Sequence, residues 1–340
     1  MARAKIRRDP TVAEIARESG VGTATVDRVL NGRDAVRDAT RSKVLSALTR
    51  LRGGETDLPV AARHRIGFLS DSGASFNTTL EAAVRAYVVD HGGLECPFTS
   101  VTTSQVHPIK LANMIERAAE SVQALVIVAR EDPIINRAIR NVTARRVPVV
   151  CITTDLPTSG RIAYIGSDQT SAGATAAYVM GQVVGSRPGK ILLIYSAPYR
   201  TQEERELGFR RVLRSEFPRL VVDERVNSND DTDWVYRNVM KYIDEHGAPA
   251  GVYNVAAGNL GIGRALTDAG LAGKVLFIGH ELNPNSRMLL ETGVMNFAIG
   301  HDVPLEVAEA IRFLTAHLQK KSPAVPPLSH VRIYTKYSCN

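Results

Sequence analysis

The chain has 340 residues, of which 44% are hydrophobic and 23% charged, a composition typical of globular proteins with two or three compact units. Its formal net charge is +7, and residues 1–63 hold 13 Lys and Arg against 8 Asp and Glu, a net +5. Most of the positive excess therefore lies in the first fifth of the chain, which fits either a polyanionic partner or a solvated basic tail.

The cysteines and the apolar segments exclude several classes of protein. Cys96, Cys151 and Cys339 are widely spaced and form no CxxC or Cys/His cluster, so neither a disulfide framework nor a metal site is predicted. No run of about 18 apolar residues is present to span a membrane, and no apolar segment follows the basic N-terminus. We therefore expect a cytoplasmic protein without cofactor, metal or membrane contact, in which Cys151 is buried.

Three short helices are predicted in the first fifth of the chain. In the first, within DPTVAEIARESG, Thr11 and Glu14 have the spacing of a capping box, and Gly20 ends the helix. The third extends from about residue 36 to residue 51 and carries apolar residues at helical spacing. Two helices joined by a tight glycine turn, with a third behind them, indicate a helix-turn-helix unit, although a plain three-helix bundle has the same pattern.

The second helix, Thr23–Asn31, has one apolar face and one face of small polar residues. Val26, Val29 and Leu30 repeat at helical spacing and are expected to be buried, and Thr23 is suited to cap the helix. The opposite face then presents Thr23, Ala24, Thr25 and Arg28. Small residues permit close approach to DNA, and an arginine can bind a guanine or a phosphate.

The stretch from residue 11 to about residue 48 resembles the DNA-binding headpiece of the LacI/GalR family of bacterial repressors. The resemblance is carried by the TVAEIA opening, the GV…ATV.RVLNG core and VRDATRSKVLSA in the third helix. It implies that Thr23 and Ala24 read bases, and that further DNA contacts come from Thr11, Thr25, Arg28 and Asn31. It also implies a double-stranded operator as partner and a homodimer.

Two features depart from that family's pattern. Asp27 replaces the usual serine, so that it either repels a phosphate or pairs with a neighbouring arginine. The following segment, RLRGGETDLPVAARHR, is shorter than the family's hinge and lacks its Tyr-x-Pro-Asn turn. Either a hinge helix that forms on DNA or a flexible linker fits residues 52–64.

From residue 65 onward, apolar β-rich runs alternate with amphipathic stretches. The runs are RIGFLS, ALVIVA, VPVVCITT, IAYIGS, KILLIYS, LVVDERV, GVYNV, KVLFIGH and MNFAIGH. Such alternation predicts buried parallel sheets in an α/β fold, and the length of the region suggests two lobes.

This region resembles the periplasmic-binding-protein-like sensor domain of the same family, closest to its sugar-binding branch. The resemblance rests on the order and spacing of RIGFLSDSGASFNTTLEAAVRAY, RVPVVCITTDLP, EERELGFRRVL, GVYNVAAGN and FIGHELNP. It implies two Rossmann-like lobes joined by three crossings, near Gly166–Gln169, near His301–Val303 and in KSPAVPPLS. The predicted division is a helix-turn-helix headpiece (1–51), a linker (52–64) and a sensor domain (65–340), with a first lobe of about 65–167 and 302–322 and a second of about 168–301 and 323–340.

Residues at strand ends are the candidates for ligand contact, since ligands of such folds bind beyond the carboxyl ends of the strands. The first candidates are Phe76, Asn77 and Asp155. Phe76 either stacks on a sugar or belongs to the lobe core, Asn77 follows it directly, and Asp155 ends the run CITTD. By resemblance, Arg205 anchors the ligand; the alternative is an exposed arginine paired with a neighbouring glutamate. Asp168 fits either a hinge or a helix cap.

Four further candidates follow later strands. Asn254 and Asn259 offer both a donor and an acceptor to hydroxyl groups. Glu281 stands where the family usually has aspartate, and His301 stands where glutamine is common. His301 fits either a structural role or a ligand contact, because it falls on a predicted crossing.

An enzymatic role is the alternative from another class. GNLGIG does not have the spacing of a phosphate-binding loop, and no GxSxG or HExxH motif is present. A sugar-processing enzyme would need an acid–base pair, which Asp155 and Glu281 supply on paper. We favour a ligand-responsive DNA-binding regulator, a repressor and not an enzyme, whose effector is a monosaccharide, polyol or sugar acid.

Overall fold

The computed structural model describes residues 10–30, 64–91, 93–103 and 106–339, together with Val36, Thr40, Lys43, Val44, Ala47 and Leu48. The chain divides into two compact units, residues 1–62 and residues 63–340. Asn31 and residues 52–63 of the predicted linker lie outside the described residues. No helix within the described ranges is long and apolar enough to cross a membrane.

Helix α1 (Val12–Ser19) begins and ends as its sequence predicts. The backbone N–H of Thr11 donates to Glu14 Oε2 (2.7 Å), and the N–H of Glu14 donates to Thr11 Oγ1 (3.3 Å), which completes the capping box. Gly20 ends the helix with φ +67°, a conformation that favours glycine. These bonds satisfy amide groups that the first turn of a helix otherwise leaves without partners.

Helix α2 (Thr23–Leu30) buries Val26 and Val29 but not Leu30. Leu30, the last residue of α2, is 39% exposed, so its predicted burial is wrong; the buried part of the helix ends at Val29. Thr23 is the first helical residue and not the cap. The cap position belongs to Gly22, whose carbonyl accepts hydrogen bonds from the N–H groups of Thr25 and Val26.

The core of this unit also contains residues from the predicted third helix. Thr40, Lys43, Val44, Ala47 and Leu48 are helical, and Val44 and Ala47 are fully buried. Val44 and Ala47 form one cluster with Ile15 of α1 and the buried valines of α2, and Leu48 packs against this cluster. Packing of these residues onto α1 and α2 is what allows helices of only eight residues to persist.

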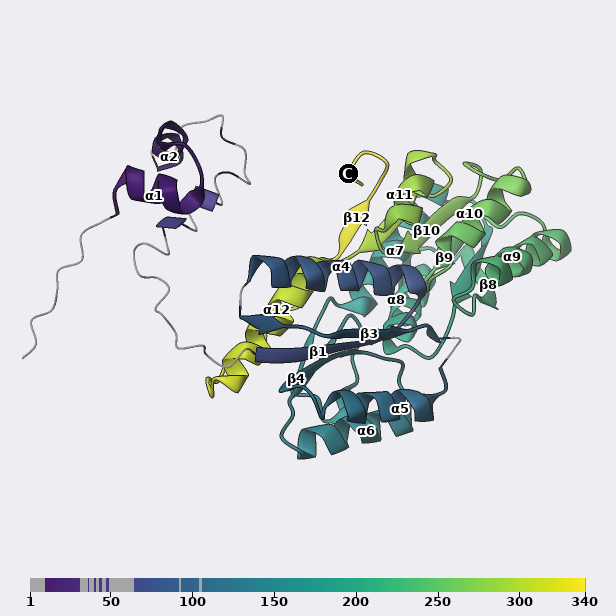
Figure 1. The fold of residues 1–340 in the computed structure, drawn as a ribbon. Helices are drawn as coiled ribbons and strands as arrows, with labels where there is room; N and C mark the ends of the chain where they lie inside the picture. Colours follow the sequence, from purple (N-terminus) through teal and green to yellow (C-terminus); the bar gives the residue numbers. More distant parts are fainter. Residues whose placement is uncertain are drawn as a thin grey trace, which may run out of the picture. The chain divides into compact units, whose positions relative to one another are not determined.

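The first lobe of the larger unit is a sheet covered on both faces (Figure 1). Its strand order is β2-β1-β4-β5-β6, with β3 also paired to β1, and every pairing is parallel. The strands are β1 (His64–Asp71), β2 (Leu94–Glu95), β3 (Phe98–Val101), β4 (Ala124–Val128), β5 (Val149–Ile152) and β6 (Ala163–Ile165). One face packs against α4 (Ala74–Asp90) and α12 (Val303–Leu318), the other against α5 (Pro108–Ala118) and α6 (Pro133–Ala144), and η3 (Pro157–Ser159) follows β5.

The second lobe has the strand order β12-β11-β10-β9-β7-β8. Its strands are β7 (Gly189–Tyr195), β8 (Leu220–Asn227), β9 (Gly251–Asn254), β10 (Leu276–His280), β11 (Phe297–Gly300) and β12 (Arg332–Tyr334). Helices α7 (Gln169–Val184) and α8 (Arg200–Glu216) cover one face, and α9 (Thr232–His246), α10 (Asn259–Asp268) and α11 (Pro284–Glu291) cover the other. The two lobes confirm the predicted α/β fold.

All nine apolar runs form strands, and Cys151 is fully buried in β5 as predicted. The sequence did not indicate β2, β3 or β12. These three are short and partly exposed, and β12 is the one strand in the described sheets that pairs antiparallel. Because an edge strand is not buried on both faces, it needs no continuous apolar run to mark it.

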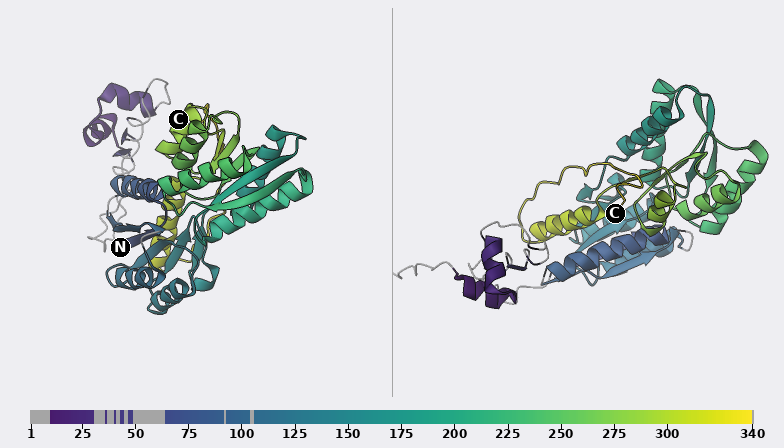
Figure 2. Two further views of the ribbon diagram at one scale, coloured as in Figure 1. Left: turned by 90° about the vertical axis from the view of Figure 1, so that its right-hand side faces the viewer. Right: turned by 90° about the horizontal axis from the view of Figure 1, so that it is seen from above.

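The chain passes between the lobes three times. The first crossing lies between β6 and α7, the second between β11 and α12, and the third between α12 and β12. In the right-hand view of Figure 2 the yellow segment after α12 runs back toward the C-terminus. Asp168 in the first crossing caps α7, because its Oδ1 accepts the N–H of Ser171 (2.9 Å).

Two glycines set the close approach of α7 and α8. A Cβ on Gly173 would lie 1.8 Å from the carbonyl oxygen of Arg205, and one on Gly208 would lie 2.0 Å from that of Thr170. No side chain fits in either place, so the two helix backbones pack directly against each other. This contact brings Arg205 of α8 next to the start of α7.

Candidate ligand-binding site and DNA-binding helix

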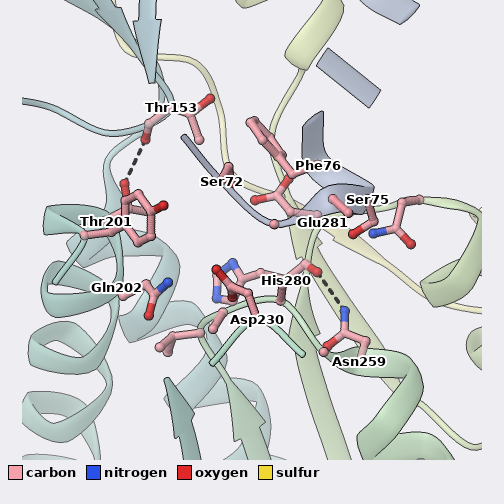
Figure 3. Close-up of a pocket in the computed structure, with 18 of the residues that line it drawn as sticks. Ser72, Ser75, Phe76, Thr153, Thr201, Gln202, Asp230, Asn259, His280 and Glu281 are labelled. Atoms are coloured by element: carbon pink, nitrogen blue, oxygen red, sulfur yellow. Dashed lines mark hydrogen bonds between the residues drawn. The ribbon is translucent and has the colours of Figure 1, made fainter. Parts of the chain in front are cut away.

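A cavity of about 210 Å³ lies between the two lobes, beyond the carboxyl ends of their strands (Figure 3). It is smaller than the roughly 300–1,000 Å³ of pockets for drug-sized ligands, so it suits a single small metabolite. The first lobe contributes Ser72, Gly73, Ala74, Ser75, Phe76, Val128, Thr153 and Thr154. The second contributes Tyr199, Thr201, Gln202, Arg205, Asp230, Thr232, Val255, Ala256, Ala257, Gly258, Asn259, Leu260, His280, Glu281, Asn283 and Asn285.

Three of the lining residues have positive φ although they are not glycine. The φ values are +64° for Thr153, +51° for Asp230 and +67° for Glu281. Such conformations cost about 1–3 kcal/mol each and persist where surrounding contacts hold them. The carbonyl of Thr153 shows such contacts, since it accepts from Gln169 Nε2 (3.2 Å) and from Thr201 Oγ1 (3.0 Å) across the lobes (Figure 3).

Arg205 lines the cavity and is 5% exposed, so the alternative of an exposed helix arginine is wrong. Its Nε donates to Gln169 Oε1 (2.8 Å), Nη1 to the carbonyl of Val255 (3.1 Å) and Nη2 to Glu281 Oε1 (3.1 Å). The guanidinium is therefore fixed before a ligand arrives, which lowers the entropic cost of binding.

Glu281 lies between two cations. Burial alone would raise its pKa, but His301 and then Arg205 outweigh that effect and hold the pKa well below its usual range. His301 Nε2 lies 3.2 Å from Glu281 Oε2. Both carboxylate oxygens of Glu281 are thus engaged by side chains of the protein, and Glu281 remains charged.

Two polar atoms of the cavity wall have no hydrogen-bond partner among the described residues, and the sequence indicated neither. Thr153 Oγ1 and Asp230 Oδ1 are buried and make no hydrogen bond. Burial raises the pKa of Asp230. Because buried polar atoms are nearly always paired, these two are available to a polar ligand in the cavity. Their only sequence signal is a polar residue after a predicted strand, which many residues share.

Contacts between the lobes close the cavity. The hydroxyl of Tyr199 in the second lobe donates to the carbonyl of Asp71 (2.8 Å) in the first and also bonds Thr103 Oγ1. The N–H of Glu131 donates to the carbonyl of Pro198 (3.0 Å), again across the lobes. The structure therefore shows the lobes in contact at the turn formed by Pro198 and Tyr199.

Of the eight predicted ligand residues, Phe76, Arg205, Asn259 and Glu281 line the cavity, whereas Asn77, Asp155, Asn254 and His301 do not. Phe76 fits both interpretations of its role, because it also packs in the first lobe's core. Asn259 lines the cavity, but its Nδ2 already donates to the carbonyl of His280 (3.0 Å; Figure 3).

The four predicted residues outside the lining contact other groups, and His301 lies between Glu281 and Glu306. Asn77 bonds Ser70 and two backbone carbonyls, and Asn254 Nδ2 donates to Asn259 Oδ1 (2.7 Å). Asp155 is held by the guanidinium of Arg161. These asparagines satisfy the local backbone, which is the commoner use of a buried amide.

The enzyme alternative required Asp155 and Glu281 in one site. Asp155 lies outside the lining and is neutralised by Arg161, so the two carboxyl groups do not form an acid–base pair in this cavity. Within the described parts of the chain, no group of three or more His, Cys, Asp or Glu is arranged to hold a metal ion.

In the smaller unit, the exposed face of α2 carries the predicted DNA-contacting residues. Thr23, Ala24 and Arg28 are exposed, and Thr25 is half-buried. Thr11 is exposed, but its side chain is engaged in the cap of α1. Asn31 lies outside the described residues.

Comparisons with known proteins agree with both units. Residues 11–52 match the profile of bacterial regulatory proteins of the lacI family, and residues 66–322 match the profile of a periplasmic binding protein domain. The chain belongs to the lacI family of bacterial regulatory proteins. The predicted resemblance is thereby confirmed for both parts of the chain. A search of curated protein sequences found no match.

Solved structures similar to this LacI-family regulator share the fold of its larger unit. A glucose-galactose binding protein from Geobacillus stearothermophilus is 18% identical with a TM-score of 0.72, over 81% of this chain and 98% of that one. A solute binding protein from Burkholderia graminis in complex with D-arabinose is 19% identical (TM-score 0.74; 81% and 96% covered). One from Agrobacterium vitis with bound D-fucose is 21% identical (TM-score 0.73; 80% and 96% covered).

Proposed function

We propose that this LacI-family regulator is a repressor that binds operator DNA through α2 and releases or engages it when a small neutral sugar or polyol occupies the cavity between the lobes. The observation that carries the proposal is the cavity itself, with Thr153 Oγ1 and Asp230 Oδ1 unpartnered on opposite lobes. A polyhydroxylated ligand can bond both lobes at once. Binding would then favour the closed state by differential stabilisation.

The charges of the lining support a neutral ligand over a sugar acid. Arg205 is the one Lys or Arg among the residues that line the cavity, and Glu281 already neutralises it. Asp230 adds a carboxylate without a cationic partner in the lining. An anionic ligand would therefore meet a wall with a net negative charge, whereas hydroxyl groups can donate to Asp230. Phe76 supplies an apolar surface for one face of a sugar ring.

The DNA-binding part of the proposal rests on α2. Thr23, Ala24, Thr25 and Arg28 would enter a major groove, and Thr11 and Asn31 would complete the proposed contacts. We propose a headpiece of residues 1–51, a linker of 52–64 and a sensor domain of 65–340, assembled as a symmetric homodimer in the cytoplasm. Two copies of α2 would then bind half-sites about one helical turn apart.

A thermal-shift screen of the purified chain against sugars, polyols and sugar acids tests the ligand. Since a ligand that binds only the folded state at 100 times its Kd stabilises by about 2.7 kcal/mol, we expect a rise in Tm of about 5–10 °C for a neutral sugar or polyol. Asp230→Asn should lower that shift, and Asp233→Asn, an exposed residue nearby, should not. A sugar acid as the sole hit would contradict the charge reasoning.

Fluorescence anisotropy with operator DNA tests the headpiece. Arg28→Ala should weaken operator binding and reduce its salt dependence, because a DNA phosphate or base contact is lost, while sugar binding stays unchanged. Arg17→Ala, an exposed arginine of α1, serves as the control. Equal operator affinity for Arg28→Ala and the wild type would remove Arg28 from the interface.

A further inference from the structure

A continuous chain of charged side chains begins in the cavity wall and leads away from it. Arg205 Nη2 lies 3.1 Å from Glu281 Oε1, and Glu281 Oε2 lies 3.2 Å from His301 Nε2. On the other side of the imidazole ring, His301 Nδ1 lies 2.8 Å from Glu306 Oε1. The side chains of His301 and Glu306 are almost completely buried. We call these four residues the charge chain.

The charge chain joins the two lobes. Glu281 and His301 follow β10 and β11 of the second lobe, whereas Glu306 belongs to α12, which packs on the first. The contact between His301 and Glu306 therefore crosses from one lobe to the other. It lies within the second crossing itself, because His301 directly follows β11.

The same chain touches the other two crossings. Ser329 of the third crossing donates its hydroxyl to Glu306 Oε1 (2.6 Å). Its backbone N–H donates to the carbonyl of Gly166 (2.8 Å) in the first crossing, and Ser329 also pairs with Ser167. All three connections between the lobes are thus linked, through one carboxylate, to a residue of the cavity wall.

The charges within the chain balance. Burial alone would lower the pKa of His301, but Glu281 and Glu306 outweigh it and hold the pKa well above its ordinary value, so the ring is an imidazolium at neutral pH. The chain then holds two cations and two carboxylates. The groups that face His301 are Glu281, Glu306, His280 of β10 and, 6.5 Å away between ring centroids, Phe76 of α4, while Arg205 of α8 contacts Glu281. Any displacement of Glu306 from His301 would leave a buried carboxylate without its cation, which is costly.

We propose that His301 is a positioning residue that couples the cavity to the lobe crossings, because its two ring nitrogens hold Glu281 of the cavity wall and Glu306 of the opposite lobe. This contact favours the closed arrangement before a ligand binds. Closure of the lobes and the position of Glu281 are then coupled through His301. A ligand that binds beside Glu281 therefore also stabilises the closed arrangement of the lobes. Only the ligand arm of the test rests on the proposed function.

Hydrogen exchange of the full-length chain without added sugar tests the closure arm. The N–H of Glu131 bonds Pro198 across the lobes, so its exchange rate reports opening. His301→Gln and Glu306→Gln should each accelerate that exchange about tenfold, a coupling within the usual range for linked sites. The double variant should exchange no faster than either single one, because both remove the same contact.

Two further variants separate coupling from loss of structure. Arg161→Gln removes an ion pair confined to the first lobe and should leave the exchange of Glu131 unchanged. Glu281→Asp keeps every charge but shortens the side chain, and should accelerate the exchange even if the neutral variants fold poorly. Exchange of Glu131 within twofold of the wild-type rate in all the folded charge-chain variants would overturn the proposal.

The ligand arm uses the neutral sugar or polyol that the thermal-shift screen identifies. His301→Gln should weaken its affinity about tenfold, and Arg161→Gln should not. Unchanged affinity in His301→Gln would overturn the coupling to the cavity. If no member of the panel binds the wild type, the proposed ligand class fails, while the exchange arm still decides the role of His301.

Discussion

Replacing Arg205 by alanine should strongly destabilise the sensor domain, because its guanidinium is the buried partner of Glu281. The side chain is 6% exposed and donates three hydrogen bonds, to Gln169, Val255 and Glu281. Breaking a buried ion pair by removing one partner costs about 3–5 kcal/mol. With a urea m-value of about 3 kcal/mol/M, a loss of about 4 kcal/mol lowers the unfolding midpoint by roughly 1.3 M.

Arg210→Ala is the matched control, since Arg210 lies on the same helix and pairs with one carboxylate, that of Glu206, at 2.7 Å. That pair is a part-buried i,i+4 contact whose glutamate also pairs with Arg225, so its loss should cost about 1 kcal/mol or less. Urea unfolding followed by circular dichroism compares the two variants with the wild type. Equal midpoints for Arg205→Ala and Arg210→Ala would refute the claim that burial gives the Arg205 contact its strength.

The same variant separates the two units of the protein. Arg205→Ala should abolish the response to the sugar, since the charge that orients Glu281 is gone, while the headpiece still binds operator DNA. Anisotropy titrations at a temperature where the variant remains folded measure both. A wild-type sugar response in Arg205→Ala would mean that the effector binds elsewhere.

Three further predictions follow from other contacts. Gly208→Ala places a methyl group 2.0 Å from the carbonyl oxygen of Thr170, so it should lower the free energy of unfolding by about 1–3 kcal/mol. A urea unfolding midpoint equal to that of the wild type would show that α7 and α8 can move apart without cost. Tyr199→Phe removes the hydroxyl that bonds across the lobes, so it should weaken the sugar affinity measured by calorimetry about tenfold. An unchanged affinity would mean that the lobes close without this hydrogen bond. His301 has a raised pKa, so its contribution to stability is complete below about pH 6.5 and is lost as pH rises toward its folded pKa. Wild-type protein should therefore lose stability relative to His301→Gln as the pH rises above about 6.5, and parallel curves would contradict this sign.

Elements with local signals could be predicted from the amino-acid order alone. The capping box of Thr11 and Glu14, the helix end at Gly20 and the nine buried strands follow from spacing and composition within a few residues. Continuous apolar runs mark strands buried on both faces, and such strands position everything else in an α/β lobe. The resemblance of one helix segment also placed Arg205 correctly in the cavity wall.

Which polar side chains meet in the cavity depends on contacts between segments that are distant in the sequence. Asn77 and Asn254 stand near strand ends, as ligand residues do, but each is held by backbone or side-chain groups next to it. Thr153 and Asp230 line the cavity because two loops, from different lobes, take positive φ and turn their polar atoms inward. A sequence shows that a polar residue follows a strand, but its direction depends on partners brought from distant segments. The charge chain from Arg205 to Glu306 exists for the same reason, since its members come together only when both lobes are folded and in contact.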